Sequence, residues 1–395
     1  MIVKKMQALG EKRSVIREIF EYGNARRAEI GAENVFDFSL GNPSVPAPDA
    51  VNESLIAMLK ECDSVSLHGY TSAPGDMGVR RAIADYLNKT YGVGAAPTDL
   101  YMTAGAAASL SACLSAVAGE GEEVIAFAPF FPEYRVFTEQ AGATLRIVPA
   151  DEVAFEINFE GLSEALSEKT AAVIINSPNN PSGAVISEES LVRLADMLRA
   201  AEKKYGHTVY LIADEPYREL AYDGTAVPYP TKYYDDTLVC YSFSKSLSLP
   251  GERIGYVLVS PTASEHDAVY AAICGAGRSL GYVCAPSLFQ KLLPSCLGMV
   301  SDLATYKTNR DLLCDALSSY GFTLQRPRGA FYLFMKSPEA DANAFCERAK
   351  KYELLLVPGD DFACPGYVRI AYCVTTEQIR RSLPAFAALA KEYQL

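Results

Sequence analysis

Residues 242–255 carry the sequence S-F-S-K-S-L-S-L-P-G-E-R-I-G, which places a lysine and an arginine directly after an apolar run at 238–241. Serines stand three and one residues before Lys245, and Arg253 follows it by eight. A lysine near a strand end can be a Schiff-base nucleophile when its surroundings lower its pKa. Hydroxyls and arginine are phosphate-binding groups. A solvated surface lysine is the alternative, and the hydroxyls and Arg253 favour the functional interpretation.

Short apolar or β-branched runs recur on both sides of this stretch, at 123–128, 144–149, 171–175, 208–213 and 254–259. Several are unbroken, which is typical of strands buried on both faces of a sheet. Helical patterns lie between several of them, as at 187–204. Strands and helices in series predict an α/β fold with a mostly parallel central sheet and helices on both faces.

The C-terminal part of the chain has a different pattern, which predicts a smaller α+β domain. Helices are expected at 301–319 and 375–393, with short strand-like runs between them at 322–326, 330–335 and 367–372. An amphipathic helix is expected at 11–32, and the first ~45 residues are expected to pack against this domain. We therefore predict a large domain over 46–290 and a small domain built from 1–45 and 291–395.

The composition of the 395-residue chain excludes several classes of function. There are 48 acidic and 36 basic residues, which gives a net charge of −12. Nucleic acids and anionic membranes bind basic surfaces, so we expect neither as a partner. The chain has only 3 histidines, which leaves little material for a zinc site or a histidine-based acid–base pair. We expect no metal.

Cysteine usage and the N-terminal sequence indicate the compartment. The 10 cysteines are scattered, with no C-x-x-C pair. No apolar h-region follows the start M-I-V-K-K-M-Q-A-L-G, and no apolar run reaches ~20 residues. Reduced, mostly buried thiols without an export signal predict a cytoplasmic protein.

Polar and aromatic side chains follow four of the predicted strands. They are Phe131 after 123–128, Asn180 after 171–175, Asp214 and Tyr217 after 208–213, and Ser242, Ser244 and Lys245 after 238–241. Open α/β sheets bind ligands beyond the carboxyl ends of their strands, so these residues predict one site. Taken singly, turn chemistry explains Asn180, core packing explains Phe131 and Tyr217, and a helix cap or salt bridge explains Asp214.

Three further positions suggest charged ligands. A carboxylate after an apolar strand, as at Asp214, is costly unless it is paired with a cation, and a protonated pyridine nitrogen would serve. Arg369 lies inside the apolar run G-Y-V-R-I-A-Y and needs either a structural acid or a substrate carboxylate. Gly105, Ala106 and Ala107 open an alanine-rich helix whose free N–H groups suit an anion, with a tight turn as the alternative.

In these residues the chain resembles pyridoxal-phosphate-dependent aminotransferases of fold type I, the aspartate aminotransferase family (class I/II). The resemblance runs from about Phe38 to Tyr393. The motifs, in the family's order, are L-G-N-P, G-Y-T-S-A-P-G, T-A-G-A-A, P-F-F-P-E-Y, N-N-P-S-G, D-E-P-Y, S-F-S-K…G-E-R-I-G and Y-V-R-I-A-Y. The lysine-to-arginine element and D-E-P-Y are the most specific of them.

The resemblance implies pyridoxal 5′-phosphate as cofactor and assigns a role to each matched residue. Lys245 corresponds to the lysine that bonds to the cofactor and moves the proton. The other cofactor positions are Asp214 at the ring nitrogen, Tyr217 and Asn180 at the 3-oxygen, Phe131 stacked on the ring, and Gly105, Ala106, Ala107, Ser242, Ser244 and Arg253 at the phosphate. Tyr70 corresponds to the tyrosine that reaches the phosphate of the other subunit, which implies a homodimer.

The resemblance also implies the reaction, a ping-pong transfer of an amino group between an L-amino acid and a 2-oxo acid. Arg369, Gly41 and Asn180 correspond to the clamp for the α-carboxylate. Arg278 lies near the segment where related enzymes place an arginine for a distal carboxylate, which would favour aspartate or glutamate. A surface role is the alternative for Arg278, and a broad substrate range is then expected.

The chain departs from the family pattern at three places, which leaves the substrate open. Ala106 and Ala107 stand where many members carry a hydroxyl, Phe131 replaces a tryptophan or tyrosine, and F-A-C-P-G at 362–366 is poorer in glycine. The main alternative function is a C–S β-lyase that uses the same Lys245 and Asp214. A cofactor-binding regulatory domain lacks the expected basic extension, and a nicotinamide enzyme lacks the G-x-G-x-x-G fingerprint.

Overall fold

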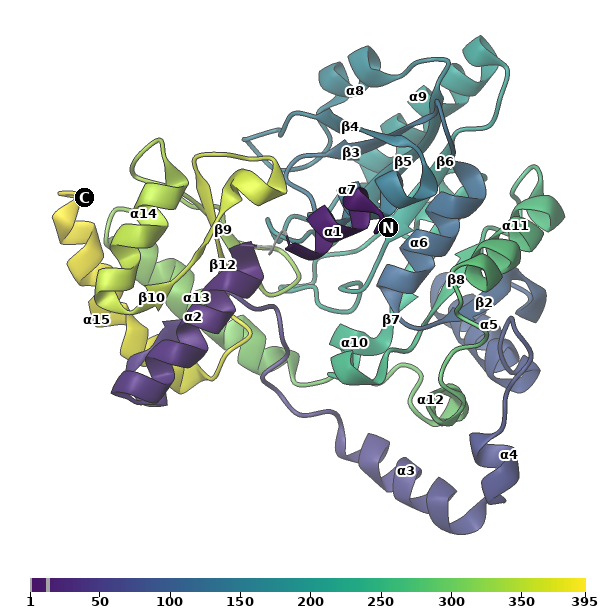
Figure 1. Cartoon of the computed structure of the whole chain (residues 1–395), viewed down its shortest axis with the longest axis horizontal. Coiled ribbons are helices and arrows are strands. Elements are labelled where there is room, and N and C mark those ends of the chain that lie inside the picture. Colours follow the sequence, from purple (N-terminus) through teal and green to yellow (C-terminus); the bar gives the residue numbers. More distant parts are fainter. Residues whose placement is uncertain (1, 12–14) are drawn as a thin grey trace.

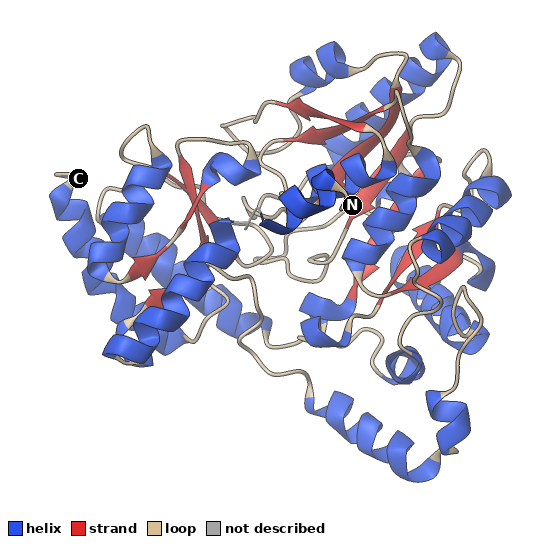
Figure 2. Cartoon of the chain, viewed as in Figure 1, coloured by secondary structure: helices blue, strands red, loops and turns tan. Residues whose placement is uncertain are grey.

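The computed structural model describes residues 2–11 and 15–395, and its centre is a seven-stranded sheet. The strand order is β2-β8-β7-β6-β5-β3-β4 (Figure 2). The strands are β2 (Leu100–Thr103), β3 (Glu123–Phe127), β4 (Thr144–Val148), β5 (Thr170–Asn176), β6 (Tyr210–Asp214), β7 (Thr237–Ser242) and β8 (Gly255–Val259). β8 runs antiparallel to both of its neighbours, and the other pairs are parallel. The predicted mostly parallel α/β sheet is confirmed.

Helices pack on both faces of this sheet, because its strands are apolar on both sides. In β5, Val173 and Ile175 face one core cluster while Ala172 and Ile174 face another. The first cluster includes α5 (Met77–Tyr91), α8 (Phe159–Ala165) and α9 (Glu188–Tyr205). The second includes α6 (Ala106–Val117), α7 (Glu133–Ala141) and α11 (His266–Ser279). The sheet edge is therefore the place left open for a site.

A second group of elements combines the two ends of the chain (Figure 1). A three-stranded antiparallel sheet has the order β11-β12-β9, and β1 pairs in parallel with β10. These strands are β1 (Phe36–Asp37), β9 (Tyr332–Lys336), β10 (Leu354–Leu355), β11 (Val357–Pro358) and β12 (Tyr367–Ala371). The helices are α2 (Val15–Ile30), α13 (Leu303–Ser319), α14 (Ala342–Ala349) and α15 (Thr376–Glu392). The domain boundaries at 45/46 and 290/291 stay a proposal.

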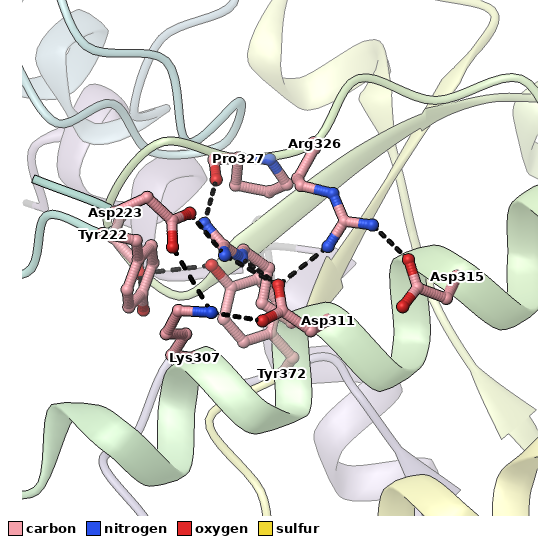
Figure 3. Close-up of polar contacts among 10 residues, drawn as sticks. Tyr222, Asp223, Lys307, Asp311, Asp315, Arg326, Pro327 and Tyr372 are labelled. Atoms are coloured by element: carbon pink, nitrogen blue, oxygen red, sulfur yellow. Dashed lines mark hydrogen bonds and ion pairs between the residues drawn. The ribbon is translucent and has the colours of Figure 1, made fainter. Parts of the chain in front are cut away.

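An ion-pair network ties α13 to two loops (Figure 3). Arg310 contacts Asp223 and Asp311 through Nη2, at 2.7 Å in each case, and donates from Nη1 to the carbonyl oxygen of Pro327 at 3.1 Å. Its guanidinium also lies 4.7 Å from the centre of the Tyr222 ring. The network joins α13 to the loop that follows Asp214 and Tyr217, and so helps to place the second group against the sheet edge.

Four details differ from the sequence-based expectations. The strand β2 was not expected, because a four-residue strand gives little periodic signal. The run at 254–259 is antiparallel, and 322–326 forms only one bridge, between Leu324 and Met335. The helix expected at 11–32 is in the structure α1 (Lys4–Glu11) and α2, with 12–14 outside the described residues.

The remaining helices are α3 (Asp49–Glu61), α4 (Ser64–His68), α10 (Phe243–Ser246) and α12 (Ser287–Leu292). In Figure 1, α3 and α4 project from the body of the molecule. Within residues 2–11 and 15–395, we find no helix whose length and hydropathy would let it cross a bilayer.

Candidate active site

A cavity of about 290 Å³ opens at the carboxyl edge of the seven-stranded sheet, where the second group of elements meets it. Most residues that the sequence singled out line this cavity. They are Gly41, Ala106, Ala107, Phe131, Asn180, Asp214, Tyr217, Ser242, Ser244, Lys245, Arg253 and Arg369. The structure thus brings together residues that are up to 328 positions apart, from Gly41 to Arg369.

Local structure explains how β6 and β7 deliver their residues to this cavity. The two strands are parallel and pair in register, with Asp214 opposite Cys240, so they end at the same edge. β7 ends at Ser242, whose hydroxyl accepts a hydrogen bond from the backbone N–H of Ser244 and begins the short helix α10. Lys245 follows within that helix, so its side chain is held directly beyond the strand end.

Lys245 has the environment of an activated amine. Its Nζ donates a hydrogen bond to the carbonyl oxygen of Gly41 at 2.7 Å and lies 5.4 Å from the centre of the Phe331 ring. Burial lowers the pKa of Lys245 to about 8, and the nearby guanidinium groups of Arg253 and Arg369 act in the same direction. A substantial fraction of the amine is therefore neutral, and able to attack a carbonyl carbon, near neutral pH.

Asp214 is a buried carboxylate with one oxygen uncommitted. The side chain is part of a residue only 5% exposed, and the hydroxyl of Tyr134 donates to its Oδ2 at 2.6 Å. Among the described residues, Oδ1 has no hydrogen-bond partner. Burial raises the pKa of Asp214 to about 7, against the effect of the Tyr134 hydrogen bond. A cationic N–H donor in the cavity would satisfy this oxygen, and a protonated pyridine nitrogen is such a donor.

An anion-binding cup lies on the other side of Lys245. The hydroxyls of Ser242 and Ser244 are 2.7 Å apart, and Arg253 donates from Nη1 to Ser244 Oγ at 3.5 Å and to the carbonyl oxygen of Pro250 at 2.9 Å. α6 begins after Gly105 without a side-chain cap, so its first N–H groups are free for a ligand.

Gly105 lies behind this cup rather than in the cavity lining. A Cβ at this position would meet Arg253 Nη2 at 2.8 Å, and the backbone φ is +84°, which favours glycine. The glycine therefore lets the guanidinium pack against the start of α6. Two hydroxyls, a guanidinium and a helix N-terminus together fit a phosphate group.

Arg369 is a buried cation whose partners are neutral. It is 2% exposed, donates from Nη1 to Asn180 Oδ1 at 3.1 Å, and donates from Nη2 to the carbonyl oxygen of Ser39. Its guanidinium carbon lies between the rings of Tyr332 and Phe362, at 4.8 and 4.9 Å from their centres.

The charge of Arg369 is not balanced within the chain. Burial lowers its pKa, and no carboxylate is among the groups that act on it. Its Nε has no hydrogen-bond partner within residues 2–11 and 15–395. Of the two sequence-based explanations, a structural acid therefore has no support here, and the arrangement suits the carboxylate of a ligand.

Comparison with known proteins places these features in a family. The sequence model of the family described as aminotransferase class I and II matches residues 33–386. The chain belongs to this family. It is a transaminase of the pyridoxal-phosphate fold type I class, and its α/β fold is of the aspartate aminotransferase type.

Several relatives of this aminotransferase are similar over almost their whole length. An aspartate aminotransferase of Thermotoga maritima is 30% identical over 369 residues, which is 89% of this chain and 90% of the relative. A crystal structure of an amino transferase from Eubacterium rectale matches with 55% identity and a TM-score of 0.98, over 100% of both chains. The aspartate aminotransferase from Thermus thermophilus with maleate matches with 26% identity and a TM-score of 0.86, over 98% and 99%.

Two predicted site residues of the aminotransferase lie outside the cavity of their own chain. Tyr70 follows α4 and is 91% exposed. Arg278 lies in the last turn of α11 and is also exposed. The roles expected for both require a second subunit, and they stay predictions.

Two tyrosines at the aminotransferase site were missed by the sequence analysis. Tyr332 lines the cavity, and its hydroxyl lies 3.0 Å from that of Tyr217. Tyr134 contacts Asp214 from behind. Tyr134 belongs to the P-F-F-P-E-Y motif, but a tyrosine among apolar residues gives no chemical signal by itself. The other lining residues not predicted are Ile16, Leu40, Leu110, Pro216 and Pro250.

Proposed function

We propose that this aminotransferase binds pyridoxal 5′-phosphate through Lys245 and transfers an amino group between an L-amino acid and a 2-oxo acid in a ping-pong cycle. The observation that supports this most strongly is the combination in one cavity of three complementary groups. They are an amine of lowered pKa, a buried carboxylate with a free oxygen, and a buried guanidinium without a carboxylate partner.

The residues present fit this cofactor. The cup formed by Ser242, Ser244, Arg253 and the start of α6 would hold its phosphate, and Asp214 Oδ1 would accept from its protonated ring nitrogen. Tyr217 and Asn180 would donate to the ring 3-oxygen, and Phe131 would stack on the ring. Bound there, the cofactor supplies an electron sink that stabilises negative charge on the substrate Cα.

The chain's own residues would perform the remaining steps. Arg369 would bind the α-carboxylate with Asn180 and the backbone of Gly41, which fixes the substrate Cα–H bond relative to Lys245. Lys245, once displaced by the substrate amine, would take the proton from Cα and return it on the neighbouring cofactor carbon. The 2-oxo acid then leaves, a second 2-oxo acid enters, and the same residues act in reverse order.

The substrate is proposed to be of the aspartate or glutamate type, or of broad range. The cations that line the cavity among the described residues are Lys245, Arg253 and Arg369, and each has a task in the scheme above. A distal carboxylate would therefore need a further cation. We propose Arg278 of a second subunit for it, which is supported by its exposure and by the relatives described as aspartate aminotransferases.

The active form is proposed to be a homodimer in the cytoplasm. Tyr70 and the nearby Ile56, Leu59 and Val65 are all more than half exposed, which is unusual for large apolar side chains gathered on one projecting segment. A second copy covering them would also place Tyr70 at the phosphate cup across the interface. The cytoplasm suits the ten cysteines, which are all free thiols in the structure.

A panel of amino donors tests the proposed function. Purified holoenzyme is incubated with each L-amino acid, first alone and then with a 2-oxo acid, and the new 2-oxo acid is measured. We expect one stoichiometric product per site without an acceptor, continued turnover with one, and parallel lines in double-reciprocal plots. Turnover of cystathionine to pyruvate and ammonia without an acceptor would instead identify a C–S β-lyase.

A further inference from the structure

Tyr134 makes the only hydrogen bond to the carboxylate of Asp214 found among the described residues. It lies in the first turn of α7, is 1% exposed, and donates to Oδ2 at 2.6 Å. Its ring is fixed from two sides. It stacks on Phe130 with an interplanar angle of 10°, and it meets Phe131 edge-on with ring centres 5.8 Å apart. The hydroxyl therefore has one well-defined position.

We propose that Tyr134 is a positioning residue that occupies one oxygen of Asp214, keeps this carboxylate ionised, and leaves Oδ1 for the ring nitrogen of the cofactor. This inference rests on the proposed function, because it concerns how the same site receives its cofactor. Tyr134 itself touches neither cofactor nor substrate in the scheme above. It acts through Asp214, and through the contact of its ring with Phe131.

The geometry gives the hydroxyl two tasks. A carboxylate that is buried without donors takes up a proton rather than remain charged, and a short O–H···O⁻ bond opposes this. The same bond fixes the carboxyl plane, so that the free oxygen is Oδ1, on the side that lines the cavity. Without it, Asp214 would be able to rotate and to hold its own proton.

The other titratable groups around Asp214 do not provide this support. Glu215 follows it in the chain and disfavours its charge, although Arg218 is paired with that carboxylate. Tyr217 and Cys240, on the neighbouring loop and on β7, are buried and their pKa values are raised well above the ordinary ones, so both are neutral. With burial raising the pKa of Asp214 to about 7, the Tyr134 hydroxyl decides how much of the carboxylate is ionised at neutral pH.

The test compares Tyr134→Phe with Tyr234→Phe. The second variant also removes a buried hydroxyl that donates to a carboxylate, that of Glu202 at 2.7 Å, but far from the cavity. The probe is pyridoxamine 5′-phosphate, which carries the ring and phosphate but forms no bond to Lys245. Its dissociation constant from apoprotein is measured by fluorescence between pH 6 and 9.

A one-unit rise in the pKa of Asp214 from about 7 would lower its ionised fraction at pH 7 from about one half to about one tenth. We therefore expect Tyr134→Phe to bind the probe about fivefold more weakly at pH 7, with little difference at pH 9. Tyr234→Phe should follow the wild type. Equal weakening at every pH would indicate lost packing and would overturn the proposal, as would unchanged binding.

Two further arms keep the result interpretable. Site-specific 3-fluorotyrosine at position 134 keeps the shape but is a stronger donor, so it should shift the acid limb of binding to lower pH. This arm decides the question if Tyr134→Phe does not fold, and a shift in the opposite direction would contradict the inference. Wild-type apoprotein that does not bind the probe at all would refute the proposed function instead.

Discussion

Lys245 donates a hydrogen bond from Nζ to the carbonyl oxygen of Gly41, with 2.7 Å between the two atoms. Gly41 follows β1, which belongs to the group of elements from the chain ends, whereas Lys245 follows β7 of the central sheet. Gly41 is also held closely, because a Cβ there would lie 1.9 Å from the Tyr332 hydroxyl oxygen. The candidate nucleophile thus lies where the two parts of the chain meet.

Asp214 should cost stability in the absence of the cofactor. Its pKa is higher in the folded chain, about 7, than its ordinary value of 3.8, so the folded state holds this proton more tightly. Stability is then present at low pH and is lost as the pH rises from about 4 to 7. Asp214→Asn should raise the free energy of unfolding of the apoprotein by about 1–4 kcal/mol at pH 8.

Urea denaturation of the apoprotein at pH 8 and pH 4 measures this effect. The two proteins should differ at pH 8 and agree closely at pH 4, where the carboxyl of Asp214 is protonated in both the folded and the unfolded state. The Asn variant should also bind the cofactor more weakly. A wild type that is more stable than Asp214→Asn at pH 8 would show that the carboxylate is paired within the chain.

Arg369→Lys should impair substrate binding while leaving the cofactor in place. Lysine keeps the positive charge but loses the planar fork, which donates to Asn180 and Ser39 and leaves Nε for a ligand. We expect kcat/KM to fall by about 10²-fold for every amino acid tested, which corresponds to about 2.7 kcal/mol. An effect restricted to dicarboxylates would assign Arg369 to the side chain of the substrate instead.

Arg278→Ala tests the origin of side-chain specificity. If Arg278 reaches the cavity of a second subunit, its loss should raise the KM for aspartate and glutamate selectively, by about 10-fold or more, with alanine unaffected. Steady-state kinetics with the three donors provide the comparison. Equal effects on alanine and aspartate would argue for a surface role of this exposed side chain.

Arg310→Ala should destabilise the fold more than Arg326→Ala. The Arg310 side chain is 2% exposed and leaves the Pro327 carbonyl without a donor when removed, whereas that of Arg326 is 43% exposed (Figure 3). We expect about 2 kcal/mol for Arg310→Ala and less than about 1 kcal/mol for Arg326→Ala. Chemical denaturation of both apoproteins measures the difference. Equal losses would mean that the network contributes only exposed ion pairs.

The sequence predicted the fold and most of the cavity lining for one physical reason. Parallel strands end at the same edge, so the residues after four apolar runs had to meet, and Asn180, Asp214 and Lys245 do so. Their side chains are polar in places where burial needs a partner, and this makes them visible in a sequence. Arg369 was visible for the same reason.

Other features had no such signal. Tyr134 and Tyr332 lie in apolar surroundings, where a tyrosine is indistinguishable from a core residue until its hydroxyl partner is seen. The antiparallel direction of β8 depends on a connection of about a dozen residues, which periodicity does not describe. Tyr70 and Arg278 are exposed, and their tasks depend on a second copy of the chain.

The most direct test of the central claim is the visible absorption spectrum and turnover of Lys245→Ala, beside the exposed-lysine control Lys232→Ala. The proposed function predicts that the wild type and the control absorb visible light through the lysine–cofactor bond and transaminate. Lys245→Ala should lose this absorbance and about 10⁴-fold or more of its turnover. A Lys245→Ala protein that keeps both the lysine–cofactor absorbance and the turnover would contradict the assignment.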